Sequence, residues 1–386
     1  MTIKNLMLAA AAAFTLVAAS AASANNNTIR IGTFNPATGP AATIGDPELK
    51  AVRLWVKLLN QKGGIDGRKI ELVEYDDQSK SAMAVSYMKR LIENDKVDIV
   101  VGGGVSGNAL AAAPIAEAAG VPFVAMGTTS RLTEPVRPWV FKVAAGEALT
   151  VRKTLIHMKN RGVTKVGLLS STSAFGVSGQ QAVRDLVPAM GMTLVADEQY
   201  ADADKDLSPQ LNTIRGKGPD AVFVFGLGAG AALAAKNYHQ LQIGKPFYVA
   251  TGNATERFIE LAGPGAEGVL MSTVAMPIVD QLADNDPRKK IIQTLKHEYE
   301  KEYKIEVSAF AATGYDGLMI AADAIRRAGG AQDKKKVREA LESTKGLVMI
   351  NGTYTYTPKD HAGLDIDSVY TMRVKGKGFV LEKDAP

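Results

Sequence analysis

The 386-residue chain contains no cysteine, only four histidines and just 6% aromatic residues. The lack of cysteine excludes disulfides, thiolate zinc sites, iron–sulfur clusters, a cysteine nucleophile and lipid attachment through an N-terminal cysteine. Four histidines leave little for metal chemistry. The 45 basic and 40 acidic residues are interspersed along the chain, whereas a nucleic-acid surface needs a concentrated basic face. We therefore expect no cofactor, no metal ion and no nucleic-acid partner.

The first 24 residues have the features of a secretory signal. Lys4 supplies a basic start, an apolar run extends from Leu6 to Ala19, and Ala22-Ser23-Ala24 offers the small residues that a signal peptidase reads. The run is shorter than the roughly 20 residues that span a bilayer, which disfavours a retained anchor. We predict a signal peptide over 1–24, cleaved before Asn25, and an exported protein that is not membrane-embedded, in a bacterial periplasm.

Short apolar strands alternate with helical segments along the rest of the chain, and the series occurs twice. One series covers 28–143, and it restarts over 151–273 without a Gly/Ser-rich or Pro-rich linker in between. Such alternation with short connections is typical of parallel sheets covered by helices on both faces. We predict an α/β fold made of two doubly wound parallel-sheet lobes.

The residues after the second series do not continue the alternation. Two long helices are expected near 286–303 and 309–328, a short one near 334–343, and the tail from 348 to 381 is β-rich. The simplest explanation is that the chain returns to the first lobe and then crosses to the second again. Several crossings make a hinge, and a cleft between two α/β domains is a common place for a ligand.

Motifs that would indicate an enzyme are incomplete. Gly102-x-Gly104-x-x-Gly107 and Gly226-x-Gly228-x-x-Ala231 each follow a predicted strand, as dinucleotide-binding loops do. Neither is followed, about 20 residues on, by the acidic residue that binds a ribose. His297-Glu298-x-x-Lys301 lacks the second histidine of a zinc-binding helix. An exported enzyme is therefore the least favoured interpretation, and we predict no catalytic residues.

Two loops are suited to binding an anion. Gly102-Gly103-Gly104 leads to Ser106 at the start of an Ala-rich helix, and Gly127 leads to Thr128 and Thr129 after the next strand. The carboxyl ends of neighbouring parallel strands share one sheet edge, where open α/β sheets bind ligands. Bared amides, hydroxyl groups and a helix N-terminus attract negative charge, although the same hydroxyls could be ordinary helix caps. We favour a carboxylate site.

Several short motifs together resemble a known family. The motifs are Thr38-Gly39-Pro40, Gly63-Gly64-Ile65-Asp66-Gly67, Tyr75-Asp76-Asp77 and Tyr315-Asp316. Their combination is similar to the solute-binding proteins of branched-chain amino acid ABC importers, and the likeness spans essentially all of 25–381. It implies a type I periplasmic-binding fold that closes around a ligand without chemistry.

This resemblance also implies how the chain is divided. Three crossings would form the hinge, with one lobe made of 25–145 plus 275–350 and the other of 146–274 plus 351–386. The ligand cleft would lie between the lobes. We expect a monomer whose partners are a small carboxylate ligand and the permease subunits of an ABC importer.

By the same likeness, particular residues would bind the ligand. A hydroxyl matching Ser106 and a backbone–hydroxyl pair matching Gly127 and Thr129 hold the substrate carboxylate in the family, and Thr128 lies between that pair. The residues expected to line the cleft are Ile44, Gly104, Phe175, Leu227, Gly228, Thr251 and Asp316. Trp55, in contrast, is expected in the core.

One departure from the family pattern bears on the ligand. Amino-acid binders of this family place an acidic residue on the second lobe to meet the ammonium, and Thr251 occupies that place here. A buried ammonium without a counter-charge costs several kcal/mol, unless Asp316 or another acid compensates. We therefore predict a small carboxylate without an amine, of the aromatic or 2-oxo acid class (benzoate, phenylglyoxylate, phenylpyruvate). A branched-chain amino acid carrier and a ligand-sensing domain for a membrane receptor stay open as alternatives.

Overall fold

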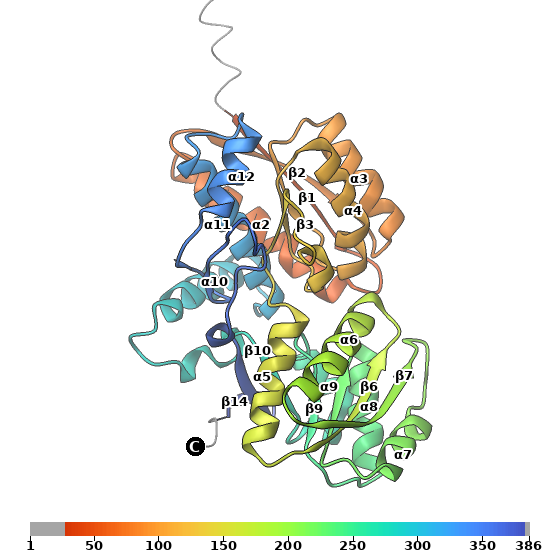
Figure 1. Cartoon of the computed structure of the whole chain (residues 1–386). Helices are drawn as coiled ribbons and strands as arrows, with labels where there is room; N and C mark the ends of the chain where they lie inside the picture. Colours follow the sequence, from red (N-terminus) through yellow and green to blue (C-terminus); the bar gives the residue numbers. More distant parts are fainter. Residues whose placement is uncertain (1–27, 383–386) are drawn as a thin grey trace, which may run out of the picture.

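The computed structural model describes residues 28–382, which form two α/β lobes arranged end to end (Figure 1). Each lobe has one main sheet with helices on both faces. The predicted signal peptide, 1–24, lies outside the described residues. Within 28–382, no helix combines the length and the hydropathy that a membrane span requires. The predicted fold class, two parallel-sheet lobes of α/β type, is confirmed.

Five parallel strands form the sheet of the first lobe, in the order β2-β1-β3-β4-β5. They are β1 (Thr28–Asn35), β2 (Lys69–Asp76), β3 (Ile99–Gly102), β4 (Phe123–Ala125) and β5 (Val140–Lys142). Val100 packs into the core beneath α3 (Ser81–Glu93) and α4 (Ser106–Ala119), while Ile99 and Val101 pack into the core on the other face. Both faces are apolar because helices cover both.

The other face of this sheet is covered by helices from both ends of the chain. α2 (Ala42–Gln61) packs there against α11 (Ala309–Arg327). Their contact includes Trp55 and Tyr315, whose rings meet edge-on with centroids 4.8 Å apart. Trp55 is only 7% exposed, so its predicted place in the core is confirmed. The remaining helices that follow the second lobe in sequence are α10 (Pro287–Tyr303) and α12 (Lys334–Glu342).

The second lobe has a seven-stranded sheet in the order β14-β13-β10-β9-β8-β6-β7. Its strands are β6 (Lys165–Ser171), β7 (Thr193–Tyr200), β8 (Ala221–Phe225), β9 (Phe247–Val249), β10 (Leu270–Thr273), β13 (Tyr370–Lys375) and β14 (Gly378–Leu381). Its helices are α5 (Glu147–Asn160), α6 (Ala174–Ala189), α7 (Ser208–Gly216), α8 (Gly228–Gln240) and α9 (Glu256–Ala262). β6 to β10 pair in parallel, whereas β13 and β14 join antiparallel. A tight turn can connect strands only in this antiparallel way.

The chain passes between the lobes three times. It leaves the first sheet after β5, returns between β10 and α10, and leaves again between β12 (Thr353–Tyr354) and β13. β12 pairs with β11 (Leu347–Val348) in a small sheet of its own. Beyond β12 the chain still follows the first lobe, because the N–H of Lys142 donates to the carbonyl of His361 at 2.8 Å. The lobe boundaries drawn from the sequence stay a prediction.

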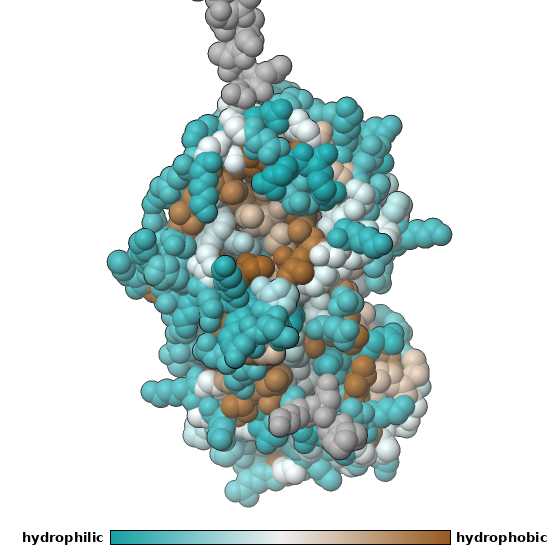
Figure 2. All heavy atoms as spheres, turned by 90° about the vertical axis from the view of Figure 1, so that its left-hand side faces the viewer, coloured by the Kyte–Doolittle hydropathy of each residue, from teal (hydrophilic) through white to brown (hydrophobic). Residues whose placement is uncertain are grey.

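The surface is mostly hydrophilic on the face shown in Figure 2, and apolar residues form several separate groups there. Among the described residues, the large hydrophobic side chains that are well exposed are Val177, Leu261 and Ile305. The bulk of the apolar side chains lies inside, on both faces of each sheet. Burial of apolar area therefore stabilises each lobe around its own sheet.

Candidate ligand site between the lobes

The two predicted anion-binding loops lie side by side at one edge of the first sheet. β3 and β4 pair in parallel with Gly102 opposite Ala125, so the chain leaves both strands at the same edge. Ser106 then begins α4. Its hydroxyl oxygen accepts the N–H of Thr129 at 3.3 Å and lies 3.3 Å from the hydroxyl oxygen of Thr128. The structure thus brings Ser106, Thr128 and Thr129 together.

Two glycines allow this close approach. A Cβ atom on Gly127 would lie 3.2 Å from the Cα of Ser106, which is tighter than ordinary packing. A Cβ atom on Gly104 would lie 1.8 Å from Oε2 of Glu48, a buried side chain of α2. Burial raises the pKa of the Glu48 carboxyl well above its usual value, and the charge of Asp77 raises it further. Gly104 and Gly127 therefore serve the site through their lack of a side chain.

The second lobe meets the loop through Ser178. This residue lies on α6, which contacts α4 of the first lobe across the boundary. The hydroxyl of Thr129 donates to the hydroxyl oxygen of Ser178 at 3.0 Å, and both side chains are buried. Sequence reasoning missed Ser178, because the pattern within a helix does not show which loop of another lobe the helix will face. Thr129 therefore lies at the lobe boundary.

A buried charge pair holds the other side of the loop. Glu147, the first residue of α5, accepts the hydroxyl of Thr128 at 3.2 Å and the N–H of Ser130 at 2.9 Å. Lys142, at the end of β5, donates to the carbonyl of Thr128 at 3.2 Å. Burial raises the pKa of Glu147 and lowers the pKa of Lys142, while each charge opposes the shift of the other. Sequence reasoning missed both residues. The one available signal was Glu147 itself, an acidic residue at the start of a helix.

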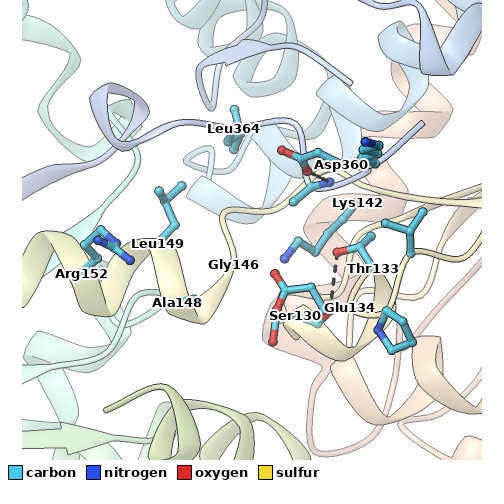
Figure 3. Close-up of a pocket in the computed structure, with 14 residues that line it drawn as sticks. Ser130, Thr133, Glu134, Lys142, Gly146, Ala148, Leu149, Arg152, Asp360 and Leu364 are labelled. Atoms are coloured by element: carbon cyan, nitrogen blue, oxygen red, sulfur yellow. Dashed lines mark hydrogen bonds between the residues drawn. The ribbon is translucent and has the colours of Figure 1, made fainter. Parts of the chain in front are cut away.

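A pocket of about 560 Å³ opens beside this charge pair, at the first crossing between the lobes. Figure 3 shows Lys142 and Ser130 on one side of it and Leu149 and Arg152 of α5 on the other. Asp360, from the third crossing, lies above them in that view. The described residues that line the pocket include none of the residues predicted for the site. The pocket therefore borders the outer side of the loop.

Aromatic and aliphatic side chains lie where the second lobe faces the first. Phe175, in the first turn of α6, is buried against Phe225 with ring centroids 4.8 Å apart. A Cβ atom on Gly252 would lie 2.8 Å from Leu227 of the second lobe and 3.8 Å from Phe310 at the start of α11. Phe310 therefore reaches the second lobe from the first. Sequence analysis did not single it out, because nothing in its local pattern distinguishes it from a core residue.

The remaining predicted cleft residues have varied surroundings. Thr251 follows β9, and its hydroxyl donates to that of Thr273 at 2.9 Å, both side chains being buried. Ile44 in α2 is half-buried. Gly228, which begins α8, is exposed and has a φ of +61°. Thr251 is thus already hydrogen-bonded within the second lobe.

Asp316, which the sequence placed at the cleft, is bonded to the segment around β12, just before the third crossing. Its carboxylate accepts the N–H of Ile350 at 3.0 Å, the N–H of Asn351 at 2.8 Å and the hydroxyl of Tyr354 at 3.3 Å. The side chain is completely buried. Burial raises the pKa of Asp316 to about 7, although these hydrogen bonds oppose the rise. Helix α11 thus turns Asp316 toward the segment between β11 and β12, and its place in the cleft stays a prediction.

The assembled site offers neutral hydrogen-bonding groups. The first lobe supplies hydroxyl groups and the N-terminus of α4, and the second lobe supplies the hydroxyl of Ser178. Such groups bind anionic or polar head groups. Among residues 28–382, no group of three acidic or histidine side chains is placed to hold a metal ion. These hydroxyl and N–H groups are suited to binding a small anionic or polar ligand.

Two α/β lobes, joined by three passes of the chain and meeting at a polar site, define a two-lobed ligand-binding protein. The chain belongs to the periplasmic binding protein family, whose model matches residues 28–378. It is a solute-binding protein of the type that serves ABC transporters. The family indicated by the sequence motifs is thereby confirmed.

Similar proteins extend over nearly the same length. The Leu/Ile/Val-binding protein homolog 3 of Brucella melitensis is 27% identical over 332 residues, which cover 85% of this chain and 87% of that protein. An extracellular ligand-binding receptor from Rhodopseudomonas palustris HaA2 has a TM-score of 0.84 and 26% identity, covering 92% of this chain and 99% of that one. The branched-chain amino acid transporter substrate binding protein LivJ from Streptococcus pneumoniae, in complex with isoleucine, has a TM-score of 0.78 and 25% identity, covering 92% and 100%.

Proposed function

We propose that this solute-binding protein captures a small carboxylate between its lobes, with Ser106, Gly127 and Thr129 receiving the carboxylate group. The observation that carries the proposal is the meeting of two hydroxyl-bearing loops beside the N-terminus of α4, at the boundary with the second lobe. Charge-assisted hydrogen bonds contribute about 1.5–3 kcal/mol each. Three or four of them supply much of the roughly 8 kcal/mol that a micromolar ligand requires.

The proposed ligand lacks an amine. Thr251, at the place where the family's amino-acid binders have an acid, is bonded to Thr273, and Asp316 is bonded to the segment between β11 and β12. An ammonium at that place would lack a counter-charge, at a cost of several kcal/mol. Phe175, Leu227 and Phe310 are apolar surroundings for the body of the ligand. These features support an aromatic or 2-oxo acid of the benzoate, phenylglyoxylate or phenylpyruvate class.

A branched-chain amino acid is the second candidate. Similar proteins carry the name Leu/Ile/Val-binding protein homolog, and one similar structure holds isoleucine. This candidate needs an acid that can reach the ammonium. Glu147 is the acid bonded to the carboxylate loop, and its charge is already shared with Lys142. The amine-free carboxylate therefore remains the preferred ligand.

Isothermal titration calorimetry with a panel of acids tests the proposal. The panel consists of benzoate, phenylglyoxylate, phenylpyruvate, leucine and isoleucine, each added to the exported protein after its bound molecules have been removed by unfolding and refolding. We expect micromolar or tighter binding of an amine-free acid and at least a hundredfold weaker binding of leucine, as about 3 kcal/mol of ammonium cost implies. Tight binding of leucine without a response to the aromatic acids overturns the ligand class.

The other predictions from the sequence are part of this proposal. They are cleavage before Asn25, function as a monomer, delivery to ABC permease subunits, and lobes made of 25–145 plus 275–350 and 146–274 plus 351–386. Mass spectrometry of the exported chain tests the cleavage site. A ligand-sensing domain for a membrane receptor is the alternative role, and loss of uptake of the bound acid on deletion of the protein distinguishes transport from sensing.

A further inference from the structure

A chain of hydrogen-bonding groups crosses the boundary between the lobes twice. The hydroxyl of Thr129 donates to Ser178, and the N–H of Thr129 donates to the hydroxyl oxygen of Ser106. That oxygen lies 3.3 Å from the hydroxyl oxygen of Thr128, which donates to Glu147. Ser178 lies on α6 and Glu147 begins α5, and these two helices pack together in the second lobe. The carboxylate loop of the first lobe is thus bonded at both ends to the second.

The two second-lobe residues at the ends of this series of hydrogen bonds, Glu147 and Ser178, lie at different distances from the hinge along the polypeptide. Glu147 comes directly after the first crossing, and the charge of Lys142 on β5 holds it near the loop. A rotation about the crossing moves such a residue little. Ser178 is reached only after α5 and β6, and its helix touches the first lobe through α4. Opening of the lobes therefore separates Ser178 from Thr129 while Glu147 stays close.

We propose that Ser178 is a positioning residue that joins the two lobes when they close, by bonding the hydroxyl of Thr129. Without a ligand Thr129 donates to Ser178. When a carboxylate takes the Thr129 proton, the bond reverses and the Ser178 hydroxyl donates to the Thr129 oxygen. The proposal rests on the proposed function in naming a carboxylate. Both hydroxyls are buried where the lobes meet, so they need each other or a ligand as a partner.

The consequence is a link between occupancy and closure. A bond present only in the closed form shifts the population toward that form by its own free energy, whether or not a ligand is bound. A ligand that takes the Thr129 proton in the closed form leaves the Thr129 oxygen free to accept the Ser178 hydroxyl, so the second lobe stays bonded to the residue that holds the ligand. Removal of the Ser178 hydroxyl should therefore affect both the ligand-free shape and the affinity.

The test compares four proteins: the wild type, Ser178→Ala, Ser178→Thr and the control Val177→Ala. Val177 is the exposed neighbour of Ser178 on α6, so its truncation changes the helix without touching the loop. Small-angle X-ray scattering of the ligand-free proteins gives the radius of gyration. Calorimetry with the tightest-binding acid of the panel gives the affinity, and thermal unfolding shows that each variant is folded.

We expect Ser178→Ala to have a larger ligand-free radius of gyration and an affinity lower by about two- to tenfold, the size of one buried hydrogen bond. Ser178→Thr, which keeps a hydroxyl, and Val177→Ala should both behave as the wild type. A Ser178→Ala protein with the radius and the affinity of the wild type overturns the inference. If no acid of the panel binds the wild type, the proposed function fails, while the ligand-free scattering still decides whether Ser178 holds the lobes together.

Discussion

At the scale of single residues, adjacent positions of the carboxylate loop have different tasks. Gly127 lets the loop approach Ser106, Thr128 is bonded to Glu147, and Thr129 faces the second lobe through Ser178. The sequence grouped Thr128 with the carboxylate donors. In the structure the Thr128 hydroxyl donates to Glu147 and that of Thr129 donates to Ser178, and the role of each toward a carboxylate stays a prediction.

Replacement of Ser106 tests the predicted donor directly. We expect Ser106→Ala to weaken binding of the carboxylate ligand by about 1–2 kcal/mol, because one hydrogen bond to the ligand and the acceptor for the Thr129 N–H are both lost. Calorimetry measures the change. Ser130→Ala is the matched control in the same loop. Ser130 bonds Glu147 through its backbone N–H, which the substitution keeps. An unchanged affinity of Ser106→Ala would remove Ser106 from the site.

Gly104 in the first loop and Gly107 in the first turn of α4 should respond differently to the same substitution. Gly104→Ala should lower the free energy of unfolding by about 1–3 kcal/mol, because the new methyl group would overlap the buried Glu48 carboxyl. Gly107→Ala should be neutral or stabilising by up to about 1 kcal/mol, since its methyl group meets nothing closer than 3.7 Å and alanine favours a helix. Urea unfolding compares the two variants. Equal changes in the free energy of unfolding would show that the overlap with Glu48 does not destabilise the Gly104→Ala variant.

At the scale of elements, periodicity predicted the helices and strands, and packing decided where some of them end. Helix α2 begins at Ala42, five residues before Pro47, and Gly45 in its first turns packs closely on Pro36 after β1. In helix α11, packing decided what Asp316 contacts. Its carboxylate accepts N–H groups of the segment between β11 and β12.

Asp316 should give the stability a pH dependence of its own. Its pKa is about 7 in the folded chain against 3.8 as the ordinary value, so folding favours the protonated form. The associated stabilisation is complete below about pH 4 and is lost as the pH rises through 7, by a few kcal/mol at most. We expect the unfolding free energy of the wild type to fall relative to that of Asp316→Asn between pH 5 and pH 8.

Chemical denaturation at several pH values measures this difference. The control is Asp323→Asn, on the same helix, whose carboxylate is paired with Arg327 near the surface. The difference between the wild type and this control should stay constant over the same pH range. A constant difference for Asp316→Asn as well would mean that the buried carboxylate of Asp316 is ionised over the whole range.

At the scale of the whole molecule, three passes of the chain connect two lobes that each have their own sheet, and one apolar cluster extends from the first lobe into the second. Each lobe is stabilised by its own sheet and helices, so the lobes can change their relative orientation at a modest cost. The contacts between them near the site are single hydrogen bonds, such as that of Thr129 with Ser178. A bound molecule that contacts both lobes therefore stabilises the closed form substantially.

A ligand should raise the thermal stability in proportion to its occupancy. At a hundred times its Kd, a ligand that binds only the folded chain stabilises it by about 2.7 kcal/mol. We expect Tm to rise steadily with the concentration of the acid identified by calorimetry, and the Ser106→Ala variant to need a higher concentration for the same rise. Differential scanning calorimetry measures both series. A Tm independent of the acid would argue against specific binding.

The sequence by itself determined the α/β class, the two series of strands and helices, and the glycine-rich loops at neighbouring strand ends. These features follow from local periodicity and from backbone requirements, which a sequence displays directly. Only the tertiary structure decided that Ser178 and Glu147 bond the loop and that Asp316 bonds the segment between β11 and β12. Such partners lie far apart in the chain, as do Thr129 and Ser178, 49 residues apart. Their pairing depends on how whole lobes meet, and no local pattern carries that information.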